Sequence, residues 1–190
     1  MQHVLEFDGF LNEANSPQKA MGILAEYVRN NPAGKKLAAD CEVLVKAMRG
    51  MGTKEDAIMN VFKSLKSKDE FVKLLALWDS LDLNYEQSGE HILGSIFKAF
   101  SGTGGAYEKN VSNRWNILSP TMKDICSKAA FWNSKGGSSE TEKYLKARKE
   151  WYAKNPKMKE TSLNYWLEEE LDSSELADLN AIIKKFGVKF

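Results

Sequence analysis

Apolar residues recur at intervals of three and four along most of this chain, and this spacing constrains its fold more than any other feature. It is clearest in residues 17–29, 36–48, 56–65 and 68–79. Such intervals place side chains on one face of an α-helix, whereas a half-buried β-strand alternates at every second residue. No segment alternates convincingly in that way. The sequence therefore predicts an all-α protein built as a helical bundle.

Residues typical of helix starts and stops divide these segments. Ser16 before Pro17 indicates a helix start, because proline is well tolerated at the first helical position. The stretch 30–34, Asn-Asn-Pro-Ala-Gly, predicts that this first helix ends there. Thr53 with Asp56 three residues later is a variant of the capping box, and it predicts the start of a further helix.

The second half of the chain is also expected to be helical, although its apolar pattern is looser. Further helices are expected at residues 88–100, 111–118, 121–132, 140–153, 163–171 and 174–186. The glycine-rich stretch 101–105 predicts a linker between two parts of the chain. The chain is therefore expected to have three segments: an N-terminal arm with the first helix (1–35), a central helical segment (36–100) and a C-terminal helical region (106–190).

The composition is that of an ordinary globular chain. With 190 residues, of which 43% are apolar and 28% charged, it can bury a sizeable core. Its 27 basic and 26 acidic residues leave a formal charge of +1. Such a balance produces no overall field that would attract nucleic acid or an anionic membrane, so any binding of that kind must be local.

The two cysteines and the absence of targeting segments suggest where the chain works. Cys41 and Cys126 lie in expected helices without the spacing of a metal site, which favours buried reduced thiols and leaves a single disulfide as the alternative. No run approaches the roughly 18 apolar residues of a membrane span, and the first residues lack the pattern of a secretion signal. We expect a cytoplasmic protein or, if the chain is viral, a component of the virion.

The local pattern that most suggests a chemistry is a glycine loop that begins at Met48 and runs to Ile58. Gly50 and Gly52 allow positive φ angles and close packing of the backbone. The carbonyl groups of Met48, Gly50 and Gly52 can then turn outward in a short arc. Hard cations such as Ca²⁺ prefer oxygen ligands of this kind.

The stretch 41–58, followed by Ser-Gly-Glu at 88–90, resembles one annexin repeat, and the resemblance covers about residues 36–100. It implies a fold with one annexin-like repeat and a C-terminal helical extension. It also implies that Ca²⁺ is held by the carbonyl groups of Met48, Gly50 and Gly52, with Glu90 as a bidentate carboxylate ligand.

A purely structural interpretation of the same residues is favoured over a calcium site. Thr53 and Asp56 can cap a helix, and the glycines can serve a tight turn. Glu90 near a helix start is favourable with the helix dipole whether or not a cation is bound. The calcium site therefore depends on Glu90 reaching across to the loop.

A second candidate is the basic, aromatic stretch 143–159. Nucleic acid could be contacted here through the residues Lys143, Lys146, Arg148, Lys149 and Trp151. An ordinary amphipathic helix is favoured instead, with solvated lysines and an inward face formed by Tyr144, Leu145, Trp151 and Tyr152. The acidic stretch 168–172 is expected to balance the basic charge.

Little in the sequence points to catalysis. The only histidines are His3 and His91, and they show no zinc-ligand spacing with the cysteines. The stretch 102–105 lacks the lysine and hydroxyl residue that follow a phosphate-binding loop, so a linker is favoured. Carboxylate pairs are defined by geometry, and the sequence selects none.

Three functional hypotheses remain. The first is a non-enzymatic helical module that binds protein partners; because residues 7–14 resemble the start of some tailed-phage proteins, this includes a phage virion or accessory protein. The second is calcium-assisted binding to an anionic lipid membrane surface or glycan through the loop from Gly50 to Thr53. The third is a cell-wall hydrolase with unidentified carboxylates.

Overall fold

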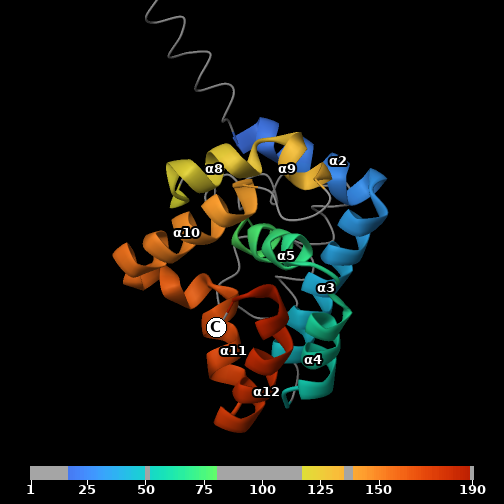
Figure 1. Ribbon diagram of the computed structural model, residues 1–190, viewed down its shortest axis with the longest axis vertical. Coiled ribbons are helices and arrows are strands. Elements are labelled where there is room, and N and C mark those ends of the chain that lie inside the picture. The colour runs from blue at the N-terminus through green and yellow to red at the C-terminus, as the bar shows by residue number, and fades with distance from the viewer. Residues whose placement is uncertain (1–16, 50–51, 81–116, 135–138, 189–190) are drawn as a thin grey trace, which may run out of the picture.

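The computed structural model describes residues 17–49, 52–80, 117–134 and 139–188. Within these ranges every regular element is a helix and no residue lies in a β-strand, which confirms the prediction of an all-α protein (Figure 1). The elements are α2 (Pro17–Asn30), α3 (Pro32–Arg49), α4 (Glu55–Ser64), α5 (Lys68–Ser80), α8 (Pro120–Cys126), α9 (Ala129–Asn133), α10 (Ser139–Lys154), the 3₁₀ helix η1 (Pro156–Thr161), α11 (Leu163–Glu170), α12 (Ser173–Ile183) and the 3₁₀ helix η2 (Lys184–Phe186).

Helix α5 lies at the centre of the molecule, with the other described helices around it (Figure 1). Its side chains are buried without interruption from Phe71 to Ser80. Trp78 of α5 packs edge-on against Trp166 of α11, with 5.1 Å between ring centroids. A helix that is buried on every side must also bury its polar residues, and those residues then need partners.

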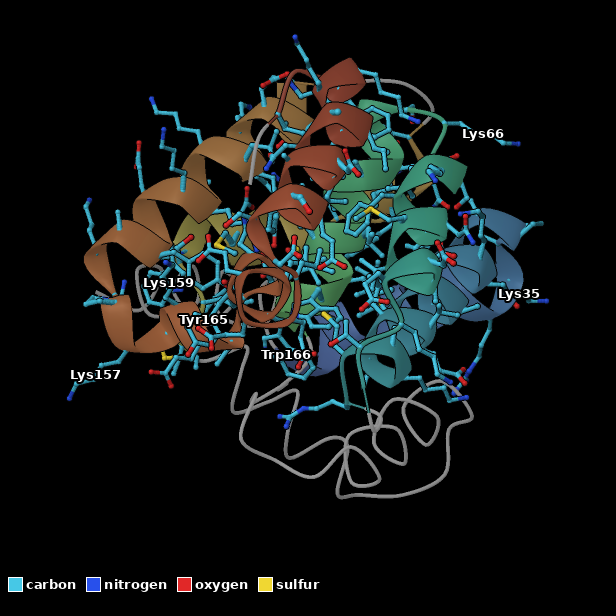
Figure 2. All side chains as sticks on the ribbon, turned by 90° about the horizontal axis from the view of Figure 1, so that it is seen from below. Lys35, Lys66, Lys157, Lys159, Tyr165 and Trp166 are labelled. Atoms are coloured by element: carbon cyan, nitrogen blue, oxygen red, sulfur yellow. The ribbon has the colours of Figure 1, made fainter. Side chains whose placement is uncertain are left out.

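One hydrophobic cluster contains the buried apolar residues, and it extends from Leu24 to Phe186. It therefore draws on described residues of all three expected segments, whose division stays a prediction. Lysines such as Lys35, Lys66 and Lys157 project from the periphery, whereas Trp166 lies among the helices (Figure 2).

The junction of α2 and α3 differs from the prediction. Helix α2 begins at Pro17 and ends at Asn30 as expected. Helix α3 already begins at Pro32, so the expected break is shorter than predicted and residues 32–34 belong to a helix. The side-chain oxygen of Asn31 accepts a hydrogen bond from the backbone N–H of Ala33 at 2.9 Å. One residue thus ends one helix and caps the next.

The expected helix 121–132 is two helices in the structure, α8 and α9. In a continuous helix the carbonyl group of Cys126 would accept from the backbone N–H four residues later. It instead accepts from the indole Nε1–H of the buried Trp132 at 2.8 Å. The side chain of Trp132 therefore replaces a helical hydrogen bond and the chain turns.

The last helices agree with the prediction to within a few residues. Helices α10 and α11 occupy the expected ranges, and the expected helix 174–186 is divided into α12 and η2. Gly187 follows with a φ of 68°, as expected for a glycine that ends a helix. The expected helix 88–100, the linker 101–105 and all but the end of the expected helix 111–118 lie outside the described residues.

Both cysteines are free and fully buried, which confirms the reduced thiols and excludes the disulfide between them. Burial raises the pKa of each thiol well above its usual value. None of the helices in the described ranges has the length and apolar character needed to cross a membrane.

The start of α12 predicts a pH-dependent stability. Backbone N–H groups of Glu175 and Ser174 donate to the Asp172 carboxylate at 2.9 and 2.8 Å, and these bonds, with one from the Ser174 hydroxyl, lower the pKa of Asp172. A pKa lowered in the folded state stabilises the protein above the unfolded-state value of about 4, and this contribution is lost as the pH falls through the folded-state value. We expect Asp172→Ala to lower the Tm at pH 7 and the difference from the wild type to narrow at about pH 2.

Thermal unfolding followed by circular dichroism at both pH values tests this expectation. The matched control is Asp178→Ala, which removes an exposed carboxylate of the same helix. It should give a similar Tm change at both pH values. A difference for Asp172→Ala that stays constant with pH would contradict the capping role of the charge.

Candidate functional site

The glycine loop is described only in part. Met48 is 3% exposed in the last turn of α3, and Gly52 has the positive φ, 82°, that the sequence suggested. Gly50 and Glu90 lie outside the described residues, so the calcium site stays a prediction. Within the part of the chain that the structure describes, no group of three or more histidine, cysteine, aspartate or glutamate side chains is placed to hold a metal ion.

Thr53 has a different role from the one predicted. Helix α4 begins after Lys54 without a side-chain cap, so the capping box of Thr53 and Asp56 is wrong. The Thr53 hydroxyl instead donates to the carboxylate of Glu170 in α11 at 2.6 Å. The backbone N–H of Lys54 donates to the carbonyl group of Ala47 at 3.1 Å. These bonds close the loop onto α3 and attach it to α11.

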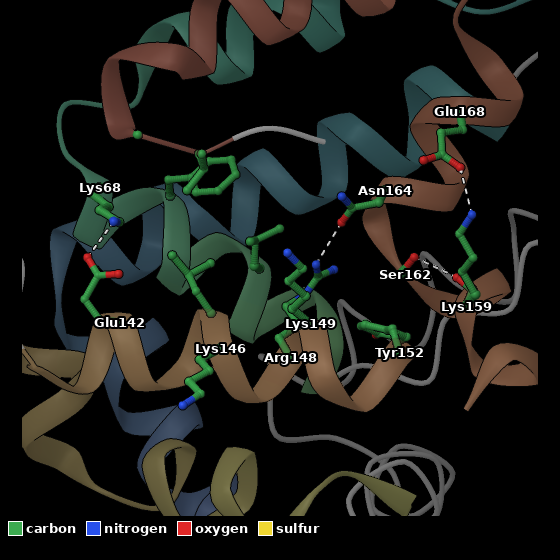
Figure 3. Close-up of a pocket in the computed structure, with 15 residues that line it drawn as sticks. Lys68, Glu142, Lys146, Arg148, Lys149, Tyr152, Lys159, Ser162, Asn164 and Glu168 are labelled. Carbon is green, nitrogen blue, oxygen red and sulfur yellow. Dashed lines mark hydrogen bonds and ion pairs between the residues drawn. The ribbon is translucent and has the colours of Figure 1, made fainter. Parts of the chain in front are cut away.

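A cavity of about 670 Å³ lies between α5, α10, η1, α11 and the residues after η2 (Figure 3). We call it the α10–α11 groove. Its lining consists of Lys68, Phe71, Leu75, Glu142, Leu145, Lys146, Arg148, Lys149, Tyr152, Lys159, Ser162, Asn164, Glu168, Gly187 and Val188. Its volume lies in the range of pockets that bind small molecules or short peptide segments, roughly 300–1,000 Å³.

Part of the groove lining is apolar. Phe71 and Leu75 of α5 line it together with Leu145 of α10 and Val188 near the end of the chain. Phe71 is in turn stacked on Phe186, with 5.6 Å between ring centroids. Phe71 and Leu75 are each only 2% exposed, so the apolar surface that a ligand could cover belongs to the half-buried Leu145 and Val188.

The charged side chains of the groove are mainly basic. Among the lining residues that the structure describes, five are lysine or arginine and two are glutamate. Lys68 pairs with Glu142, and Lys159 pairs with Glu168 at 3.2 Å. Lys146 and Lys149 are exposed and have no hydrogen bond or ion pair with any residue in the described ranges. The groove thus combines apolar side chains with an excess of positive charge.

Behind the groove lies a buried polar network centred on Asp79 of α5, which is 0% exposed. Its carboxylate accepts from the hydroxyl of Tyr144 at 2.9 Å, from the hydroxyl of Tyr152 at 2.8 Å and from Nε of Arg148 at 2.7 Å. Arg148 also donates from Nη1 to the side-chain oxygen of Asn164 at 2.8 Å. The network connects α5, α10 and α11.

The protonation states in this network follow from burial and charge. Burial raises the pKa of Tyr144 and the nearby Asp79 carboxylate raises it further, so this hydroxyl stays a donor. Burial by itself lowers the pKa of Arg148, but Asp79 and Tyr152 raise it above its usual value. Arg148 therefore remains a cation that faces a carboxylate.

The basic stretch 143–159 behaves mostly as an amphipathic helix. Tyr144 is fully buried and Trp151 half-buried, whereas Lys143 is exposed. Arg148, which the nucleic-acid hypothesis placed on the surface, is 8% exposed and paired with Asp79. The expected balance by acidic residues is seen in the pair between Lys159 and Glu168. A contact with nucleic acid stays a prediction.

Sequence reasoning did not identify the groove as a site. Lys68 and Glu142, which meet across its edge, are 74 residues apart, and no local pattern connects them. No pattern in the sequence indicates a role for Asn164. The sequence did contain one indication of the buried network. Asp79 follows an apolar run in α5, and a carboxylate that is buried with such a run needs a polar partner.

Comparison of the chain with protein-family models, with curated proteins and with solved structures finds no match.

Proposed function

We propose that this protein is a non-enzymatic helical interaction module, and that the α10–α11 groove binds an acidic, partly apolar segment of a protein partner. The observation that carries this proposal is the combination of lining residues within the described ranges, which joins a net charge of +3 to apolar side chains. An acidic segment would meet the lysines of the lining while its apolar side chains cover the half-buried Leu145 and Val188.

A peptide is favoured over the other anionic ligands because of the two glutamates. Glu142 and Glu168 lie on opposite sides of the groove (Figure 3), where they would repel a continuous row of phosphates. Their ion pairs with Lys68 and Lys159 also lower the charge available to an anionic membrane surface. A peptide can place its acidic residues near Lys146 and Lys149 and keep them away from the two glutamates.

The rest of the chain acts as the scaffold in this proposal. Residues 36–100 are proposed to form an annexin-like repeat, and their helix α5, which supplies Phe71 and Leu75, packs against α10. The proposal that the chain is a phage virion or accessory protein is consistent with such a binding role. Calcium bound at the loop from Gly50 to Thr53 is not required.

Fluorescence anisotropy with a defined probe tests the proposed function. The probe is a fluorescein-labelled octapeptide of alternating leucine and glutamate, amidated at its C-terminus. We expect saturable binding that weakens with added salt, because exposed charges are screened. Lys146→Glu combined with Lys149→Glu should weaken binding at least about tenfold, since two attractive charges become repulsive.

The matched control is Lys35→Glu combined with Lys66→Glu, which makes the same charge change away from the groove. Lys35 and Lys66 lie on the opposite side of the molecule from Lys157 and Lys159 (Figure 2). The control should change the affinity by less than about threefold. Equal losses in both double variants, or tighter binding to oligothymidine or to phosphatidylserine vesicles than to the peptide, would contradict the proposed function.

A further inference from the structure

The guanidinium group of Arg148 has donors that the protein leaves unused. Of its five N–H groups, Nε and Nη2 donate one each to Asp79, at 2.7 and 3.4 Å. Nη1 donates one to the side-chain oxygen of Asn164 at 2.8 Å. Two N–H groups, one on each terminal nitrogen, remain without an acceptor among the described residues.

The side chain that carries these donors lines a cavity. Arg148 and Asn164 both line the α10–α11 groove, and the guanidinium group lies between α10 and α11, directed toward Asn164 (Figure 3). Because Asn164 uses its oxygen for Arg148, its amide nitrogen is directed elsewhere, and it has no acceptor within the described ranges. The remaining N–H donors of Arg148 and the amide of Asn164 thus belong to two lining residues that are in direct contact.

The surrounding groups hold this arrangement in place. Asp79 fixes one edge of the guanidinium group, and Tyr144 and Tyr152 hold Asp79 through their hydroxyl groups. The guanidinium carbon also lies 4.9 Å from the centre of the Tyr152 ring. An arginine oriented in this way loses little conformational entropy when it binds a planar anion.

We propose that Arg148 and Asn164 form a carboxylate-binding subsite of the groove, which holds an aspartate or glutamate side chain of the bound peptide. A carboxylate can accept from the remaining guanidinium N–H groups, and charge-assisted bonds of this kind are stronger than neutral ones. Asp79 already balances the charge of Arg148, so the exposed Lys149, the next residue in α10, supplies the positive charge that the second carboxylate needs. This inference rests on the proposed function and assigns the specificity of that same groove.

The first test needs no substitution in the protein. The probes are two capped octapeptides, one of alternating leucine and glutamate and one of alternating leucine and glutamine. NMR titration should show that the glutamate peptide binds at least tenfold more tightly and shifts the Nε–H resonance of Arg148. A third peptide, the glutamine sequence with a free C-terminal carboxylate, tests the other carboxylate of a peptide. If it alone shifts that resonance, the assignment to side chains is wrong.

The second test changes Asn164. Asn164→Asp places a negative charge beside the subsite, so it should weaken binding of the glutamate peptide at least tenfold and leave the glutamine peptide within about threefold. Asn164→Ala removes only the amide and should weaken the glutamate peptide by about threefold to tenfold. Asn60→Asp is the control, because Asn60 is exposed on α4, which contributes no residue to the groove. It should leave both affinities within twofold.

The outcomes separate the two proposals. If neither peptide binds, the proposed function is wrong and the subsite is wrong with it. If the glutamate peptide binds and depends on Lys146 and Lys149, but Asn164→Asp has no more effect than Asn60→Asp, only the subsite is wrong. Equal affinities for the glutamate and glutamine peptides would also overturn it.

Discussion

Asp79→Asn is expected to lower the free energy of unfolding by about 3–5 kcal/mol, because it leaves the buried cation of Arg148 without its counter-charge. Asp79 is 0% exposed, and its oxygens accept from three side chains of α10. An amide of the same shape has only one acceptor oxygen and turns its N–H groups toward these donors. Urea denaturation followed by circular dichroism measures the change.

The control for Asp79 is an ion pair with the same chemistry on the surface. Asp124 and Lys128 pair at 2.6 Å, and both side chains are close to half exposed. Asp124→Asn should cost less than about 1 kcal/mol, since water screens the charges and replaces the bond. Similar costs for Asp79→Asn and Asp124→Asn would show that burial does not amplify the interaction of Asp79 with Arg148.

A double-mutant cycle can assign the effect to the pair. Arg148→Gln alone should also be strongly destabilising, because it leaves the Asp79 carboxylate buried without a cation. The double variant, Asp79→Asn with Arg148→Gln, buries neither of the two charges. Its loss of stability should therefore be clearly smaller than the sum of the two single losses. Additive losses would mean that the two residues act independently.

Helix positions and their buried faces were predictable because they depend on local spacing. The expected stripe of α5, with Phe71, Leu74, Leu75 and Trp78, is buried as predicted. The opposite face of α5 is buried too, and no local pattern indicates that. Burial on both faces results from α5 lying between helices that are distant in sequence, which the spacing within one segment does not encode.

The candidate site was much less predictable for the same reason. Thr53 looked like a helix cap because Asp56 follows it at the right distance, but its hydroxyl donates to Glu170, 117 residues away. Arg148 looked like one more surface cation, whereas its partner is 69 residues away in α5. In both cases a long-range partner decides the role of the side chain, and a single sequence does not reveal such partners.

Gly34 shows how a residue typical of a loop can instead be required inside a helix. A Cβ atom at this position of α3 would lie 2.3 Å from the carbonyl oxygen and 2.8 Å from the carbonyl carbon of Tyr27 in α2. Both are backbone atoms of a helix, so they cannot move aside as a flexible side chain would. The missing side chain of Gly34 permits this close approach where α2 and α3 are joined by the single residue Asn31.

We therefore expect Gly34→Ala to destabilise the protein by about 1–3 kcal/mol, although alanine is the better helix former. Gly22 provides the matched control, because it is exposed within α2 and a Cβ atom there would meet nothing within 4 Å. Gly22→Ala should stabilise the protein by roughly 0.5–1 kcal/mol. Urea denaturation should therefore show that the two substitutions change the free energy of unfolding in opposite directions. If Gly34→Ala were also stabilising, helices α2 and α3 could separate without cost, and the close contact at Tyr27 would not hold them together.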